Sequence, residues 1–288
     1  MSSSKVSLRV PCSYQGGKQR IAKQIVDRLL LATNGHASCA HFYDLCCGSG
    51  AITLELINRG IRPDQITMLD KSSWGTFWMR IGSGRFDLEK FRSMLSDIPE
   101  DKRLVKSYMA ELAKEPVDDN EAYLYPILQS CSFGGKQIWL KDGKWQNAFF
   151  RNYWEPTANS VRKSPANPMQ PSPATLLTRI TNIAEQCEGL TCLRGDAMAL
   201  ANRPFPTMSI VYIDPPYEEA TSYGFELDIR IFIEEFLKNN VGPLVVSEAV
   251  PLTAHAAQLS LAGSNGGISG YRRHRNQEWL SVFGKSSL

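Results

Sequence analysis

The sequence predicts an α/β protein whose sheet is mostly parallel and is interrupted after its second strand. Three observations carry this prediction. Short apolar runs end at acidic residues, amphipathic stretches lie between those runs, and residues 74–185 lack the alternation. We therefore expect a sheet domain formed by residues 1–73 and 186–288, with an inserted, mainly helical unit at 74–185.

The first half of the sheet is predicted from periodicity. Apolar residues at fourfold spacing predict an amphipathic helix over 18–31. The apolar run 40–46 ends at a glycine loop, which favours a buried strand. A helix at 51–58 and a second strand at 66–70 follow.

The middle of the chain has a different character. From residue 73 to about 185 we expect helical stretches without strands, one of them marked by Leu88, Phe91 and Leu95. Four closely spaced prolines between 165 and 173 predict a loop, because proline can continue neither a helix nor a central strand.

Alternation resumes after the proline-rich loop. A helix is predicted at 176–184 and another at 229–237. Strands are predicted at 190–196, 209–214, 243–247 and 278–283.

Composition narrows the class of protein. The chain has 288 residues, of which 43% are hydrophobic and 21% charged, and its net charge of +3 does not by itself indicate a polyanion partner. Its seven cysteines include no C-x-x-C pair, so we expect reduced thiols and no metal site. The N-terminal segment has no apolar core typical of a signal peptide, which favours a cytoplasmic protein.

A glycine loop follows the first predicted strand, in the segment Asp44-Leu-Cys-Cys-Gly48-Ser-Gly50. Glycines let the backbone approach a bound nucleoside, and an acid after the next strand, here Asp70, can accept hydrogen bonds from ribose hydroxyls. The segment lacks G-x-G-x-x-G, so a single nucleoside is favoured over a dinucleotide. The alternative is an ordinary turn.

The most specific motif is Asp214-Pro215-Pro216-Tyr217, directly after the strand at 209–214. Two prolines stiffen the backbone and remove two N–H donors, so the corner presents acceptors. A carboxylate and a carbonyl suit the two hydrogens of an –NH2 group, and Tyr217 offers a face for stacking a base. The alternative is a rigid turn with a buried aromatic residue.

A third motif, Tyr14-Gln-Gly16-Gly17-Lys18, precedes the first predicted helix. Exposed backbone N–H groups and the positive charge of Lys18 suit a carboxylate, or the motif is a plain loop-to-helix junction.

These motifs together favour transfer of a methyl group to an exocyclic amine. The lone pair of such an amine is delocalised into its ring. Two acceptors that hold its hydrogens would favour a pyramidal nitrogen and stabilise the developing charge. No metal or cysteine nucleophile is needed.

The three motifs, in this order, resemble those of the Dam-type DNA adenine-N6 methyltransferases, the alpha group with the Asp-Pro-Pro-Tyr motif. The resemblance implies a Rossmann-like class I methyltransferase sheet with an inserted target-recognition domain, and S-adenosyl-L-methionine as cofactor. It also implies cofactor contacts from Tyr14, Lys18, Asp70 and Asp214, with Asp214 also gripping the target amine, and a weaker match adds Asp196. The glycine loop and the turn before the first helix add Gly17, Asp44, Gly48 and Gly50 to the candidate cofactor contacts. By the same resemblance, residues 272–280 match the closing hairpin and strand.

The sequence departs from the family pattern at three places. Cys46-Cys47 stands where an aromatic and a variable residue are usual, and Lys71 replaces the usual Asn after Asp70. Asn147-Ala148-Phe149 replaces an Asn-x-Pro in the insertion, which bears on target sequence more than on catalysis.

Basic residues in two regions predict contacts with DNA phosphates. Those in the insertion are interleaved with aromatic residues, a pattern typical of phosphate contacts combined with stacking. The alternative is a solvated face over a small aromatic core. The candidate DNA-binding residues are Lys136, Lys141, Lys144, Arg151, Arg272, Arg273 and Arg275.

We therefore expect a site-specific DNA adenine-N6 methyltransferase that acts on an adenine flipped out of double-stranded DNA. Cytosine-N4 methylation needs the same grip on an amine, although aspartate rather than serine in the motif favours adenine. RNA or a protein amide are further possible substrates. From a different class, the alternative is a non-catalytic nucleic-acid-binding module with a degenerate cofactor pocket.

Overall fold

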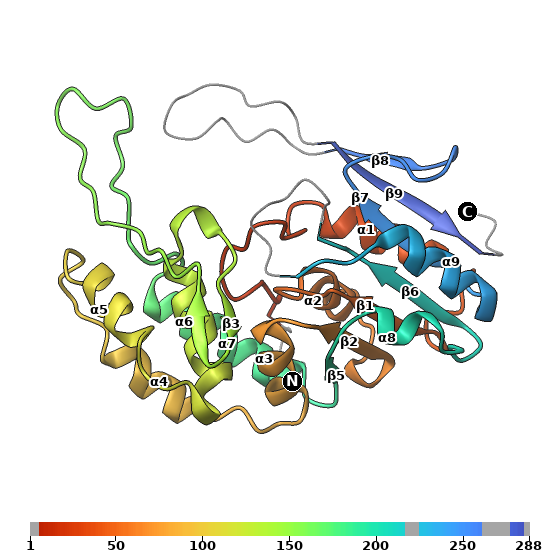
Figure 1. Ribbon diagram of the computed structural model, residues 1–288, viewed down its shortest axis with the longest axis horizontal. Coiled ribbons are helices and arrows are strands. Elements are labelled where there is room, and N and C mark those ends of the chain that lie inside the picture. Colours follow the sequence, from red (N-terminus) through yellow and green to blue (C-terminus); the bar gives the residue numbers. More distant parts are fainter. Residues whose placement is uncertain (1–5, 217–224, 261–276, 285–288) are drawn as a thin grey trace.

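A computed structural model describes residues 6–216, 225–260 and 277–284. Within these residues, seven strands form one sheet in the order β5-β2-β1-β6-β7-β9-β8. Five neighbouring strands are parallel, while β9 is antiparallel to both of its neighbours. The mostly parallel α/β sheet predicted from the sequence is confirmed, and it is compatible with a Rossmann-like fold (Figure 1).

The sheet strands agree with the predicted ones to within two residues at either end. Their bounds are β1 (His41–Leu45), β2 (Ile66–Asp70), β5 (Thr191–Arg194), β6 (Ser209–Ile213), β7 (Leu244–Glu248), β8 (Ala257–Leu259) and β9 (Glu278–Phe283). The short strand β8 was not predicted, because three residues are too few to show an alternating pattern.

Helices cover both faces of the sheet. On one face, α8 (Met198–Ala201) and α9 (Ile229–Asn239) pack on a cluster that includes Leu45, Val211 and Val246. On the other face lies the larger cluster of buried residues. It includes Phe42 and Met68 of the sheet together with buried residues of α1 (Ala22–Leu31), α2 (Ala51–Asn58) and α3 (Ser73–Gly82).

The elements between residues 83 and 186 gather beyond the β5 side of the sheet, far from β8 (Figure 1). Their bounds are α4 (Leu88–Ser96), α5 (Val105–Leu112), α6 (Glu121–Cys131), β3 (Trp139–Lys141), β4 (Lys144–Gln146) and α7 (Pro173–Gln186). Single 3-10 turns lie at Pro63–Gln65, Asp118–Asn120 and Phe133–Gly135. The core cluster of α1 to α3 continues through this region, and α3 itself contacts β2 and β5.

The expectation that residues 73–185 contain no strand is wrong. Strands β3 and β4 pair in an antiparallel hairpin that turns at Asp142 and Gly143, both with positive φ. An Asp-Gly pair is the usual signal for such a two-residue turn. The flanking strands are too short to show a period of two.

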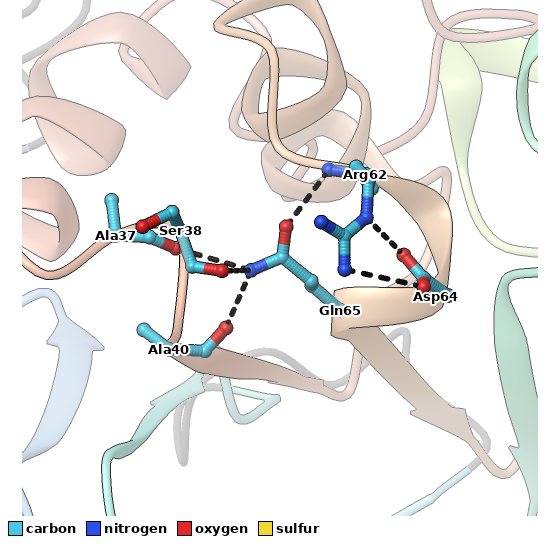
Figure 2. Close-up of polar contacts among 6 residues, drawn as sticks. All are labelled: Ala37, Ser38, Ala40, Arg62, Asp64 and Gln65. Carbon is cyan, nitrogen blue, oxygen red and sulfur yellow. Dashed lines mark hydrogen bonds and ion pairs between the residues drawn. The ribbon is translucent and has the colours of Figure 1, made fainter.

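A buried glutamine fixes the chain where it enters β1. The side-chain amide nitrogen of Gln65 lies 3.1, 3.0 and 2.9 Å from the carbonyl oxygens of Ala37, Ser38 and Ala40 (Figure 2). Its side-chain oxygen accepts from the backbone N–H of Arg62. The loop before β1 is thereby tied to the start of β2, and the two strands keep one register up to their far ends.

In the part of the chain that is described, no helix combines the length and apolar character needed to cross a membrane.

Candidate active site

Three of the predicted acids meet where the strand order reverses. Asp44 is in β1, Asp70 ends β2, and Asp214 directly follows β6, the strand on the other side of β1. In open α/β sheets, ligands bind at this reversal, beyond the carboxyl ends of the strands. The sheet therefore brings the three acids to the expected edge.

The acids line two adjoining cavities. Asp214 and Asp70 line the larger cavity, of about 80 Å³. Asp214 and Asp44 line the smaller cavity, of about 30 Å³. Tyr14, Lys18 and Cys46 line both. A separate surface depression of about 550 Å³ lies between residues 6–9 and α7, but none of the predicted site residues lines it.

The glycine loop adopts a conformation that requires its glycines. Gly48 and Gly50 have φ values of 50° and 76°, a region that side chains disfavour. A Cβ atom at Gly50 would overlap the indole ring of Trp78. The same indole donates to the carbonyl oxygen of Gly48 at 2.9 Å, so Trp78 holds the loop from beneath.

Asp44 lines the smaller cavity and also fixes the start of α2. Its Oδ2 accepts from the Thr53 hydroxyl at 2.7 Å and from the Thr53 backbone N–H at 3.2 Å. Burial raises the pKa of Asp44 to about 7, against these hydrogen bonds.

Asp70 also binds the chain around it. Its Oδ2 accepts from the Gly48 backbone N–H at 2.7 Å, and its Oδ1 accepts from the N–H and hydroxyl of Ser72 at 2.8 and 2.5 Å. Burial raises the pKa of this carboxyl, although its hydrogen bonds oppose the rise. Asp70 thus secures the glycine loop to β2, and its Oδ2 accepts only one hydrogen bond among the described residues, so it retains acceptor capacity.

Lys18 lies against the acid of the Asp-Pro-Pro-Tyr motif. Its ammonium nitrogen is 2.6 Å from Oδ1 of Asp214 and 3.6 Å from Oε1 of Glu278. It also donates to the carbonyl oxygen of Gly16 at 3.2 Å. The prediction placed Lys18 on the first helix, but α1 begins at Ala22, and Lys18 precedes it in a turn.

Glu278 is a residue of this site that the motifs did not single out. It lies at the start of β9, and its Oε1 accepts from the Ser247 hydroxyl at 2.5 Å. The sequence signal was a single acid at the start of an otherwise apolar strand. Only the antiparallel placement of β9 beside β7 brings it to Lys18.

Two carboxylates and one ammonium group therefore share a nearly buried space. The side chains of Lys18, Asp214 and Glu278 are 7%, 17% and 8% exposed. Burial raises the pKa of Asp214 to about 7; Lys18 opposes this rise, and the negative charges of Glu278 and Asp44 add to it.

The diproline corner lines the larger cavity. Pro215 and Pro216 lie beside Asp214, and Phe225 and Gln137 complete the same wall. Tyr217, the last residue of the motif, lies outside the described residues.

The aromatic and glycine residues of the third motif lie over the glycine loop. A Cβ atom added at Gly48 would lie 3.1 Å from the ring of Tyr14. This ring packs edge-on against Trp74, with 6.1 Å between the ring centres. The backbone N–H of Gly17 donates to the carbonyl oxygen of Tyr14 at 3.0 Å. The motif thus forms a tight turn above the loop that carries Gly48.

Asp196 lies beyond β5, at the rim of the site. Its Oδ2 binds the ammonium group of Lys71 at 2.8 Å, and its Oδ1 accepts from the backbone N–H of Met198 at 3.0 Å. Lys71 lines the larger cavity, and its ammonium lies 5.6 Å from the ring centre of Phe225.

The four described DNA-binding candidates fall into two groups. Lys136, Lys141 and Lys144 are exposed on or beside the β3–β4 hairpin. Arg151 is half-buried, and its guanidinium donates to Ser132 O at 2.8 Å and Gln170 Oε1 at 2.7 Å. The other candidates, Arg272, Arg273 and Arg275, lie outside the described residues.

The thiols near the site are protonated at neutral pH. Burial raises the pKa of Cys46 and Cys47 well above the ordinary value, and nearby carboxylates, Asp70 foremost, raise it further. Among residues 6–216, 225–260 and 277–284, no group of three or more His, Cys, Asp or Glu side chains is placed to hold a metal ion.

Neither the models of protein families nor the curated proteins include a match to this chain.

Proposed function

We propose that the protein is an S-adenosyl-L-methionine-dependent methyltransferase that acts on the N6 amine of an adenine flipped out of double-stranded DNA. The observation that carries the proposal is the cavity at the strand-order reversal. It has two adjoining parts, one lined by Gly48 of the glycine loop and the other by the rigid acceptor corner of Asp214, Pro215 and Pro216. The inserted region at 74–185 would serve target recognition, and the antiparallel β9 supports the closing hairpin and strand that the class I methyltransferase resemblance implies.

The chemistry of the lining fits the cofactor. Gly16 and Gly17 offer backbone groups above the glycine loop, and Asp70 offers acceptors for the ribose. Asp196 lines neither cavity, but it binds Lys71 at the rim and would offer an acceptor for the adenine ring from there. The cavities of about 80 and 30 Å³ are smaller than the roughly 300 Å³ usual for such ligands. Cofactor binding would therefore require lining residues, such as Tyr14, which lines both cavities, to move apart.

When bound, S-adenosyl-L-methionine supplies a methyl group; the amine nitrogen bonds to its carbon, the C–S electron pair stays on sulfur, and one amine proton is released to solvent. The protein's residues prepare the amine. Asp214 in its ionised form accepts one N–H, and the carbonyl oxygen of the diproline corner accepts the other. Holding the nitrogen in line with the methyl group lowers the barrier further.

The test is radiolabelled methyl transfer to duplex DNA, followed by nucleoside analysis. We expect label in N6-methyldeoxyadenosine, and Asp214→Asn should reduce the rate by about 10²–10³-fold because it removes the charged acceptor. Asp64→Asn, an exposed aspartate paired with Arg62, is the control and should keep the wild-type rate. Label in N4-methylcytosine or in RNA would redirect the proposal, and no label from any nucleic acid would end it.

A further inference from the structure

Gln137 is a buried polar side chain whose oxygen lacks a partner. The residue is 3% exposed, and its Oε1 makes no hydrogen bond within the described part of the chain. Gln137 is one of the residues that line the cavity of about 80 Å³, together with Asp214, Pro215 and Pro216. A buried acceptor without a donor costs about 1–3 kcal/mol, so a group that supplies a donor would be bound favourably.

The backbone that carries Gln137 is held on both sides. The side chain of Gln129, which is fully buried, donates to the carbonyl oxygen of Lys136 at 3.0 Å and accepts from the N–H of Ile138 at 3.0 Å. The amide of Asn147 donates to the carbonyl oxygen of Gln137 itself at 2.7 Å. The orientation of this segment is therefore fixed by three hydrogen bonds that involve neither its side chain nor the cavity.

The segment is also fixed to the rest of the site. The backbone N–H of Gln15 donates to the carbonyl oxygen of Gly135 at 2.8 Å, which ties the turn before Gln137 to the chain between Tyr14 and Lys18. The backbone that carries the unpartnered oxygen is thus held in place in the lining of the cavity that Asp214 also lines, as expected of a preorganised recognition group.

We infer that Gln137 recognises the target base, and that its carboxamide pairs with an edge that places an amine beside a ring nitrogen. This inference rests on the proposed function and names the base selectivity of the same site. Oε1 would accept an N–H of the amine, and the amide nitrogen would donate to the neighbouring ring nitrogen. A purine that lacks the amine would leave Oε1 without a donor, and a flip of the carboxamide could not restore one.

Deoxyadenosine and purine 2′-deoxyriboside provide a matched pair of probes, because the second lacks only the amine at position 6. Their dissociation constants can be measured by NMR titration of the full chain, without any methyl transfer. We expect the wild-type protein to bind deoxyadenosine about tenfold more tightly, which corresponds to one hydrogen bond of about 1.4 kcal/mol.

Three variants test the assignment. Gln137→Met keeps the length of the side chain but removes both polar groups, so the ratio of the two constants should fall to near one. Gln137→Glu keeps an acceptor and should retain the preference for deoxyadenosine. Gln146→Met changes a glutamine of β4 outside both cavities and should behave as the wild type.

The outcomes separate this inference from the proposed function. A Gln137→Met protein that is folded and keeps the wild-type ratio would overturn the inference. Equal dissociation constants of the wild-type protein for the two nucleosides would overturn it as well. If selectivity depends on Gln137 but no nucleic acid is methylated, the base site stands and the catalytic proposal fails. If methylation occurs but the ratio does not depend on Gln137, the catalytic proposal stands and the assignment of Gln137 to base recognition fails.

Discussion

At the scale of single residues, the site depends on how the charge of Asp214 is shared. Lys18 binds it at 2.6 Å, and Glu278 lies 3.6 Å from the same ammonium nitrogen. The ionised form of Asp214 is the stronger acceptor for an amine hydrogen, because both of its oxygens then share the negative charge and neither donates. Glu278 gives Lys18 a second carboxylate partner while Asp214 holds the amine.

Glu278→Gln should therefore change the pH dependence of methyl transfer. The wild-type rate should rise with pH as Asp214 ionises, with half of the rise near its pKa of about 7. Removing the negative charge of Glu278 lowers that pKa, because Glu278 and Asp44 raise it while Lys18 lowers it. The acidic limb should move to lower pH by roughly one unit.

The control for this variant is Glu121→Gln. Glu121 is a buried glutamate that pairs with Arg194 at 2.7 Å and does not line either cavity. The rate of methyl transfer by Glu121→Gln should depend on pH in the same way as the wild-type rate. An unshifted profile for Glu278→Gln would show that Glu278 does not act on Asp214.

At the scale of elements, the glycine loop is shaped by the helix beneath it. Gly50 and Gly60 both have positive φ, but only Gly50 has a side chain from α3 over the place of a Cβ. The two glycines therefore separate backbone strain from crowding.

Gly60→Ala should lower the free energy of unfolding by about 1 kcal/mol, the cost of a side chain in the left-handed region. Gly50→Ala should lower it by a further ~1–3 kcal/mol, because its Cβ meets Trp78. Urea unfolding measures both values. Equal losses for the two variants would mean that the ring moves aside without cost.

Gln65 acts on the strand that carries Asp44 from the opposite end of the sheet. Gln65→Met keeps the volume but leaves the carbonyl oxygens of Ala37, Ser38 and Ala40 without their donor. We expect the free energy of unfolding to fall by about 2 kcal/mol. The half-buried Gln186 donates to a single carbonyl oxygen, that of Val6, so Gln186→Met is the control and should cost much less.

At the scale of the whole molecule, the position of a basic residue decides whether it can bind a phosphate. Lys141 and Lys144 are exposed at the tip of the β3–β4 hairpin, whereas Arg151 already donates to Ser132 and Gln170. The guanidinium of Arg151 therefore stabilises the fold and is not available to a phosphate.

Binding to duplex DNA should therefore respond differently to three substitutions. In a plot of log affinity against log salt concentration, Lys141→Met and Lys144→Met should each reduce the slope by about 1. Arg151→Met should leave the slope unchanged but lower the free energy of unfolding by about 2 kcal/mol. Lys238→Met, at a lysine paired with Glu235 in α9, is the control. An unchanged slope for both hairpin variants would exclude the hairpin as a phosphate-binding surface.

The sequence by itself determined the order and type of most elements. The strands ending at Asp70 and beginning at Glu278 were predicted to the residue, because their apolar runs are bounded by charged residues or turns. The places of the acids followed from the same pattern, since the carboxyl ends of parallel strands share one edge.

Only the tertiary structure decided which side chains meet there. Glu278 reaches Lys18, and Gln137 reaches the cavity beside Asp214, across long separations in the chain. Asp44 and Asp70 proved to hold the glycine loop in place through Thr53, Gly48 and Ser72. Periodicity reports which face of an element is buried, but contacts between distant elements depend on strand order and packing, which no local pattern encodes.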